Sequence, residues 1–359
     1  TAAAQALFTS QPGVSKQVKL LEDELSLQLF TRKGKSLAAL TEAGEEVVAR
    51  ARKILTEVGN IKSLSQEMAG SRQGKLVVAT THTQARYVLP DLLEDFHREY
   101  PDISIDLHQG TSDRISRQVL EQGADFAIAS GHSELFEKLV TFPIYSWERA
   151  ILVQPDHPLA ALDGISIEDL ARYPIISYTH SFDDDSDLAN AFREADIEPN
   201  VVFIAEDPDV IKTYVRKGLG VGVIACMAYD PDRDSDLVAV RVPHLFPLCT
   251  TWIGFRRDRF LRDYMHAFIE MMVPDIDRDC ITRAAEDSSG QSCKVVSLVQ
   301  PALADDAEEP GVLLAHPRTY RPAGVPVTNR NITFIPQRVV RQFVRFQVAV
   351  HIAIAPVRH

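Results

Sequence analysis

Short apolar segments and helix-like segments alternate along most of the chain, between about residues 75 and 272. Residues 76–80 and 124–129 are apolar runs of the length of a buried strand, and residues 86–100 between them have apolar positions at helical spacing. The alternation begins again after Trp147. Repeated strand–helix–strand units predict a mostly parallel sheet covered by helices. We therefore expect an α/β body made of two lobes.

A different pattern precedes this body, in residues 1–40. Ser10 is a good helix N-cap, and Val14, Val18 and Leu21 give the helix that follows one apolar face. The opposite face is polar, and glutamine can read an adenine edge while serine and lysine reach phosphates. The pattern predicts a helix-turn-helix; the alternative is an ordinary helical hairpin with a solvated face. The candidate DNA contacts in this helix are Ser10, Gln11, Pro12, Ser15, Lys16 and Lys19.

Residues 27–40 read as a short strand, a turn and a return strand, which predicts a two-stranded wing. Arg32 and Lys33 lie near its tip and are further candidates for contact with a DNA backbone. The whole chain carries a formal net charge of −12, which argues against a general nucleic-acid binder. Basic residues outnumber acidic ones in residues 1–36, so DNA contact through one small module fits this charge distribution.

Residues 41–70 are expected to form one long helix that Thr41 caps. Apolar side chains recur along it at spacings of three and four residues, as in a coiled-coil seam. The helix either packs on its own domain or pairs with a second copy of the chain, and we favour pairing because no neighbouring segment of the small head would cover it. The seam residues are Val47, Ala51, Ile54, Val58, Ile61, Leu64 and Met68.

Several motifs of this chain are collinear with those of one protein family. The motifs are Ser10-Gln11-Pro12, Val14-Ser15-Lys16, Leu29-Phe30-x-Arg32 and Leu40-Thr41-x-x-Gly44, and further along the runs at residues 80–87 and 209–215. The first four resemble the N-terminal domain of LysR-type transcriptional regulators. The last two resemble the CysB-like subgroup, which activates the cysteine-biosynthesis regulon. The resemblance covers about residues 1–275.

The resemblance implies a winged helix-turn-helix at residues 1–40, a linker and dimerisation helix at 41–70, and a periplasmic-binding-protein-like effector domain at 75–275. Lobe I would comprise residues 75–145 and 249–275, and lobe II residues 146–248. In the family a further helix precedes the position of Thr1. The implied partners are operator DNA, RNA polymerase and a second copy of the chain, with dimers pairing into tetramers. The implied location is the cytoplasm, and the implied effectors are acetylserine, sulfate and thiosulfate, with no other cofactor.

Thr80-Thr81-His82-Thr83-Gln84 follows a predicted strand and opens a predicted helix. Hydroxyls and free N–H groups at such a junction can bind an anion although the site has no positively charged side chain. The alternative is a plain threonine-rich N-cap. The resemblance implies that Thr81, Thr83 and Gln84 line the effector pocket together with Ser130 and Trp147. Asp183 stands where the family has another hydroxyl. Either Asp183 turns to solvent, or the ligand differs and carries a cation such as an ammonium group.

The remaining motifs predict no further functional site. The glycines of residues 217–223 mimic a nucleotide loop but leave a helix and enter a strand, so they predict a helix C-cap and a turn. No metal-ligand spacing and no catalytic set has supporting context, so we expect no enzyme and no metal site. The alternatives are a LysR-type regulator of another pathway with a different small anion and a two-lobed solute-binding protein. No apolar run reaches the ~18 residues of a membrane span, and residues 276–359 are expected to be poorly ordered.

Overall fold

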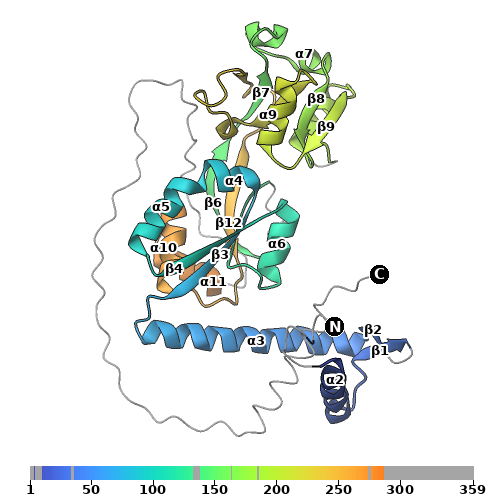
Figure 1. The fold of residues 1–359 in the computed structure, drawn as a ribbon, viewed down its shortest axis with the longest axis vertical. Coiled ribbons are helices and arrows are strands. Elements are labelled where there is room, and N and C mark those ends of the chain that lie inside the picture. Colours follow the sequence, from blue (N-terminus) through green and yellow to red (C-terminus); the bar gives the residue numbers. More distant parts are fainter. Residues whose placement is uncertain are drawn as a thin grey trace. The chain divides into compact units, whose positions relative to one another are not determined.

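The structure is a computed structural model that describes residues 4, 10–33, 36–131, 138–162, 164–183, 186–273 and 276–286 (Figure 1). The chain forms two compact units, which divide between residues 66 and 67. The first unit contains the predicted helix-turn-helix and most of the long helix. The second contains the α/β body.

The first unit is built around helix α2 (Gln11–Leu25). Ser10 caps this helix, and its side chain accepts a hydrogen bond from the Gly13 N–H at 3.2 Å. Val14, Val18 and Leu21 are buried, so the predicted apolar face is the face that packs. The expectation of a capped amphipathic helix at this position is confirmed. Residues 1–3 and 5–9, which precede it, lie outside the described residues.

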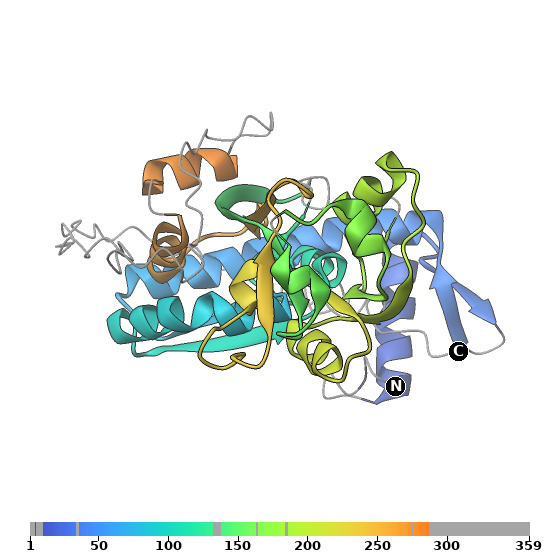
Figure 2. The same cartoon turned by 90° about the horizontal axis from the view of Figure 1, so that it is seen from above.

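The predicted wing is an antiparallel hairpin of β1 (Phe30–Lys33) and β2 (Ser36–Leu40), which Figure 2 shows as a pair of arrows. The buried carboxylate of Glu22 in α2 accepts hydrogen bonds from the N–H groups of Leu29 at 2.9 Å and Phe30 at 3.2 Å. Two charge-assisted hydrogen bonds therefore join the helix to the start of the hairpin.

Helix α3 (Glu42–Met68) follows the hairpin, and the Thr41 hydroxyl accepts a hydrogen bond from the Gly44 N–H at 2.9 Å. A side chain at Gly44 would place its Cβ 2.0 Å from the Leu29 carbonyl oxygen. Only glycine allows this close approach of α3 to the hairpin. The motif Leu40-Thr41-x-x-Gly44 therefore has a packing cause.

The first lobe of the second unit is a five-stranded sheet with strand order β4-β3-β5-β12-β6. β3 runs parallel to β4 and β5, whereas β12 is antiparallel to β5 and β6. Helices α5 and α10 lie on one face of this sheet and α6 lies on the other (Figure 1). The strands are β3 (Gly74–Thr80), β4 (Ile103–Gln109), β5 (Phe126–Ser130), β6 (Val140–Trp147) and β12 (Cys249–Phe255). The helices are α4 (His82–Tyr87), α5 (Leu89–Glu99), α6 (Ser112–Leu120), α10 (Asp263–Met272) and α11 (Arg278–Glu286).

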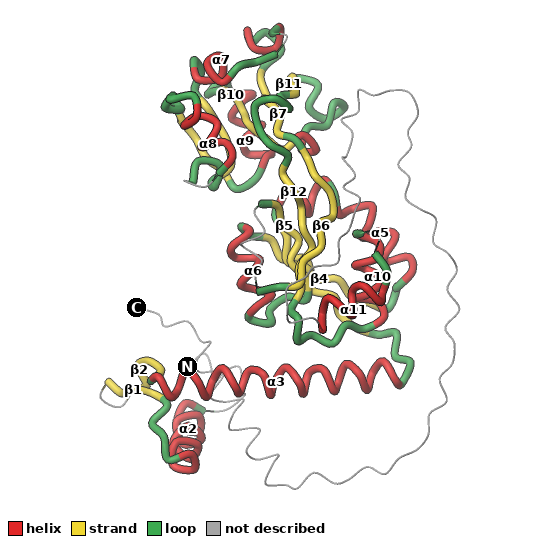
Figure 3. Tube along the Cα trace, turned by 180° about the vertical axis from the view of Figure 1, so that it is seen from behind, coloured by secondary structure: helices red, strands yellow, loops and turns green. Residues whose placement is uncertain are grey.

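The second lobe is another five-stranded sheet, in the order β11-β7-β10-β8-β9. Figure 3 shows β6 and β12 as neighbouring strands that run from the first lobe toward the second. The predicted two-lobed α/β body is confirmed. The strands are β7 (Arg149–Val153), β8 (Ile175–Tyr178), β9 (Val201–Ala205), β10 (Val221–Ala225) and β11 (Val238–Arg241). The helices are α7 (Ile167–Ala171), α8 (Asp187–Glu194) and α9 (Pro208–Arg216).

Gly218, directly after the C-cap of α9, has φ +72°, which confirms that the glycines of residues 217–223 end a helix and form a turn. Two expectations need correction. The helix predicted at residues 86–100 begins earlier and is interrupted at Val88, since Pro90 has no N–H to continue the α4 ladder.

The second correction concerns the tail. Poor order was expected from residue 276, but α11 buries Ile281 and Ala284 against the core of the first lobe. Residues 287–359 lie outside the described residues. Within the described ranges, no helix combines the length and the apolar character needed to cross a membrane.

Candidate functional site

The polar face of α2 is exposed, as a DNA-reading helix requires. Gln11 and Lys16 are both exposed, whereas Val14 and Val18 are buried. Pro12, Ser15 and Lys19 are exposed as well, and Ser10 is exposed while it caps the helix. The backbone of Arg32 and Lys33 belongs to β1, but their side chains lie outside the description.

In the second unit, several predicted ligand residues meet where strands of the first lobe end. Thr81 follows β3 and caps α4, and its hydroxyl accepts the Gln84 N–H at 3.4 Å. Ser130 is the last residue of β5 and lies opposite Thr251 of β12. Trp147 is the last residue of β6. Strand ends and the start of α4 therefore bring together side chains that are far apart in the sequence.

These side chains form one hydrogen-bond network, which we call the hydroxyl–indole network. Its members are Gln84, Ser130, Tyr145, Trp147 and Thr251. The Ser130 and Thr251 hydroxyls are 2.8 Å apart, and Trp147 Nε1 donates to them at 3.1 and 3.2 Å. Gln84 Nε2 lies 3.4 Å from both hydroxyls, and the Tyr145 hydroxyl donates to Gln84 Oε1.

The network carries no formal charge, and its members are buried except Ser130, which is half-buried. Gln84 and Thr251 are almost fully shielded from solvent. Burial raises the pKa of Tyr145 to about 12, so its hydroxyl stays protonated at neutral pH. Hydroxyl, amide and indole groups can all donate hydrogen bonds to an anion. Such a set suits a small anion or an uncharged polar group better than a cation.

Thr83 lies near the hydroxyl of Tyr178 at the end of β8 and offsets part of the rise that burial causes in the pKa of that hydroxyl. The same hydroxyl accepts the Ala225 N–H at 3.1 Å. Burial raises the pKa of Tyr178 to about 12. Thr83 therefore lies where the helix that holds Gln84 approaches the opposite lobe.

Asp183 is not part of this network. Its carboxylate lies 2.7 Å from Nδ1 of His180, and its side chain is 55% exposed on the loop after β8. Of the two sequence-based alternatives, this arrangement agrees with the one in which Asp183 turns to solvent.

Tyr145, Tyr178 and Thr251 are not among the residues that the sequence predicts for the site. Thr251 lies in β12, and only the register of that strand places it beside Ser130. No local signal marked the two tyrosines, which read as ordinary strand aromatics.

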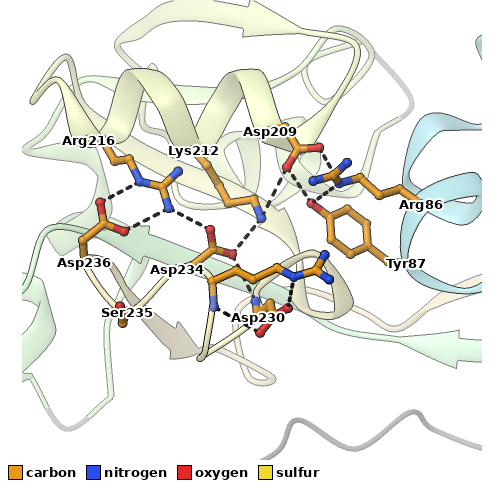
Figure 4. Close-up of a pocket in the computed structure, with 10 residues that line it drawn as sticks. Arg86, Tyr87, Asp209, Lys212, Arg216, Asp230, Asp234, Ser235 and Asp236 are labelled. Atoms are coloured by element: carbon orange, nitrogen blue, oxygen red, sulfur yellow. Dashed lines mark hydrogen bonds and ion pairs between the residues drawn. The ribbon is translucent and has the colours of Figure 1, made fainter.

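A separate polar cavity of about 500 Å³ lies where the end of α4 meets α9 (Figure 4). Its four basic and four acidic side chains pair with one another, so it offers no net charge to a ligand. The sequence patterns predict no site at this cavity. The lining residues are Arg86, Tyr87, Asp209, Lys212, Arg216, Asp230, Arg233, Asp234, Ser235 and Asp236.

The most buried pair in this cavity is Lys212 and Asp234, 2.7 Å apart. Burial by itself would raise the pKa of Asp234, but hydrogen bonds from Lys212 and Arg216 outweigh it and lower that pKa. His82, Asp207 and Asp209 could each offer a metal ligand atom, and these atoms lie within 4.8 Å of one another. Arg86 and Lys212 already neutralise the Asp209 carboxylate, which disfavours a divalent cation there.

An exposed recognition helix with a wing, attached to a two-lobed body with a buried polar network, defines a DNA-binding regulator with a ligand-binding domain. The family models agree with this class. Residues 1–45 match the bacterial regulatory helix-turn-helix protein of the lysR family, and residues 69–275 match the LysR substrate binding domain. The chain belongs to the LysR family of transcriptional regulators.

Its relatives include several HTH-type transcriptional regulators. The chain is 45% identical to the HTH-type transcriptional regulator CysB of Haemophilus influenzae, over 82% of this chain and 91% of the relative. It is 43% identical to the HTH-type transcriptional regulator SsuR of Burkholderia cenocepacia, over 77% and 90%. It is 36% identical to the HTH-type transcriptional regulator cbl of Escherichia coli, over 80% and 92%.

Solved structures show the same architecture. The cofactor-binding domain of the Cbl transcriptional regulator matches with a TM-score of 0.57 and 34% identity, over 60% of this chain and 95% of that domain. A full-length OxyR variant from Pseudomonas aeruginosa matches with a TM-score of 0.53 over 75% and 89%, and at 23% identity it supports the fold alone. The predicted resemblance and fold class are confirmed. Because these relatives are transcriptional regulators, the prediction that the chain is not an enzyme is confirmed too.

Proposed function

We propose that this regulator activates genes of sulfur assimilation and cysteine synthesis. The proposal is supported by the identity with CysB and by the match to Cbl, together with the subgroup motifs at residues 80–87 and 209–215. It acts in the cytoplasm, where it binds operator DNA through α2 and the wing and contacts RNA polymerase. In this proposal residues 1–40 are the DNA-binding domain, 41–70 the dimerisation helix and 75–275 the effector domain.

The observation that carries the effector proposal is the hydroxyl–indole network. Sulfate and thiosulfate present several acceptor oxygens, and acetylserine presents a carboxylate and an acetyl carbonyl. A neutral donor that binds a charged acceptor contributes roughly 1.5–3 kcal/mol, so three or four donors suffice for a specific small-anion site. A bound anion would take over donors that the network members now share with one another. Thr81, Thr83, Gln84, Ser130 and Trp147 are the proposed ligand residues.

The large exposed side chains of the α3 seam support a homodimer, whereas Ala51 near the start of the seam is buried. Ile61 is 63% exposed and Met68 is 68% exposed, and Ile54 and Leu64 are also exposed on this helix. A row of large apolar side chains at coiled-coil spacing on one helix is stabilised when a second copy covers it. We propose that two copies pair through α3 and that such dimers associate into tetramers, as is common for symmetric regulators.

One observation favours a second candidate, a LysR-type regulator of another pathway with a different small anion. Asp183 replaces the hydroxyl that the subgroup resemblance leads us to expect in lobe II, so this chain departs from the subgroup at that position of the proposed site. A ligand that does not need this hydroxyl would bind through the hydroxyl–indole network and Thr83 alone.

The test is calorimetry on the full chain with sulfate, thiosulfate, O-acetyl-L-serine and N-acetyl-L-serine. Thr83→Val removes one hydroxyl at nearly constant volume and should weaken the tightest of these ligands by one to two decades, on the order of one charged hydrogen bond. Thr282→Val removes an exposed helical hydroxyl in α11 and serves as the matched control. If Thr83→Val and Thr282→Val bind the ligand with equal affinity, Thr83 does not line the site. Absence of binding by all four ligands would refute the effector proposal.

A further inference from the structure

Three side chains of one helix in the first lobe converge on a single carboxylate of the second lobe, and Figure 4 shows two of them, Arg86 and Tyr87. The helix is α4, and the carboxylate belongs to Asp209 in the first turn of α9. The Tyr87 hydroxyl donates to Asp209 Oδ1 at 2.7 Å, and Arg86 Nε lies 2.8 Å from Oδ2. His82 Nε2 lies 3.3 Å from the same Oδ2. We call this set the interlobe clasp.

Lys212 holds the carboxylate from its own lobe. Its amino group lies 3.5 Å from Asp209 Oδ1 and 2.7 Å from Asp234, and it is also 5.1 Å from the centre of the Tyr87 ring. Burial by itself would raise the pKa of Asp209, but hydrogen bonds from Tyr87 and His82 and the two neighbouring cations lower it. The carboxylate is therefore ionised at neutral pH and accepts charge-assisted hydrogen bonds from the opposite lobe.

The same short helix carries proposed ligand residues. Thr83 and Gln84 lie between His82 and Arg86, and α4 has six residues, so about one and a half turns hold both sets of contacts. A helix this short moves as one rigid piece. Any change that releases Asp209 from α4 also changes where Thr83 and Gln84 stand relative to the second lobe.

We propose that Asp209 is a positioning residue for effector binding: it holds α4 against the second lobe and so keeps Thr83 and Gln84 in the arrangement that binds the ligand. The inference rests on the proposed function, because it assumes that these two side chains contact the effector. Asp209 itself does not contact the ligand in this account. Its removal lowers the fraction of molecules in the binding arrangement, and apparent affinity falls by that same fraction.

The cavity provides a matched control. Asp236 is also an aspartate of this cavity, but its partner Arg216 belongs to the same lobe, with contacts of 2.7 and 2.9 Å. Asp236→Asn removes an ion pair of similar geometry without removing an interlobe contact. Asp209→Asn removes the ionised acceptor that faces the first lobe. The comparison separates interlobe positioning from loss of any charged pair.

The experiment is calorimetry of the full chain with sulfate and with N-acetyl-L-serine. Asp209→Asn should weaken binding roughly tenfold, which corresponds to a fall of the binding-competent fraction from near one to about a tenth. Asp236→Asn should stay within about twofold of the parent. Asp209→Glu should recover part of the affinity, since it restores the ionised acceptor. If Asp209→Asn binds as tightly as Asp236→Asn, the proposal is overturned.

Hydrogen exchange of the amides of α4 supplies a readout that does not need a ligand. Without ligand, Asp209→Asn should speed exchange in α4 relative to Asp236→Asn, because the clasp no longer restrains the helix. If the parent chain binds neither probe, the effector proposal fails and exchange alone judges the clasp. Unchanged exchange in α4 would then overturn the clasp as well.

Discussion

Trp147 has two acceptors for its buried indole N–H, and that redundancy predicts a strong coupling between them. Ser130 and Thr251 each lie within hydrogen-bonding distance of Nε1, at 3.1 and 3.2 Å. Ser130→Ala or Thr251→Val alone leaves the other hydroxyl in place. The double variant leaves no hydroxyl acceptor at either position.

The number of hydrogen bonds that each variant loses sets the expected change in the free energy of unfolding. Each single variant removes neutral hydrogen bonds without leaving the indole N–H unpaired, so each should lower the free energy of unfolding by roughly 0.5–1.5 kcal/mol. The double variant also leaves a buried donor unsatisfied, which costs roughly 1–3 kcal/mol more. Both single variants also break the Ser130–Thr251 hydrogen bond, so the sum of their losses counts roughly 1 kcal/mol twice. The coupling energy between the two positions should therefore be roughly 1 kcal/mol, above the few tenths expected for independent sites.

Urea unfolding followed by tryptophan fluorescence measures this coupling. The chain has two tryptophans, Trp147 and Trp252, and both lie in the second unit, so the signal reports on that unit. A double variant whose loss equals the sum of the single losses within about 0.5 kcal/mol would contradict the argument. It would show that water reaches the indole N–H once both hydroxyls are gone.

Three further predictions concern the head, the long helix and the second lobe. Gln11→Ala should relax base discrimination by roughly 1–3 kcal/mol, whereas Lys16→Ala should weaken binding to all DNA sequences and lower the salt slope by about one. Fluorescence anisotropy on specific and random DNA tells the two variants apart, and a Gln11→Ala variant that loses equal affinity for both DNAs would exclude base reading by Gln11. Replacing Ile54 and Ile61 with aspartate should raise the dimer dissociation constant at least a hundredfold, since burial of each isoleucine contributes roughly 1.5–3 kcal/mol; a dimer of unchanged stability by sedimentation would rule out the seam. Asp183→Thr should leave sulfate affinity within about threefold, because this half-exposed carboxylate already pairs with its neighbouring histidine; a tenfold gain by calorimetry would place it at the ligand.

The parts of the molecule that were predictable depend on local patterns. The apolar face of α2, its Ser10 cap and the glycine after α9 follow from residues within one or two turns of each other. The two-lobed body follows from the alternation of strands and helices, because parallel strands need crossover helices. The family resemblance then selected Gln84, Ser130 and Trp147, which lie together in the structure.

The unpredicted parts depend on contacts between distant segments. Thr251 joins the network only because the β12 register places it opposite Ser130 and Tyr145, more than a hundred residues earlier in the chain. The clasp joins α4 to α9 across the lobes, and local sequence patterns contain no information on that pairing. Helix α11 was missed because its two buried side chains are too few to make a clear periodic pattern.

In the proposed function, a small anion bound by α4 and the hydroxyl–indole network controls DNA binding. The most direct test measures, at one fixed salt concentration, the affinity of the full chain for promoter DNA upstream of a cysteine-biosynthesis gene, with and without N-acetyl-L-serine. The parent chain should prefer the promoter to a scrambled sequence, and the ligand should raise its promoter affinity several-fold. Thr83→Val should keep the basal affinity and lose the ligand response. Equal binding to scrambled DNA, or a response that survives in Thr83→Val, would contradict the account.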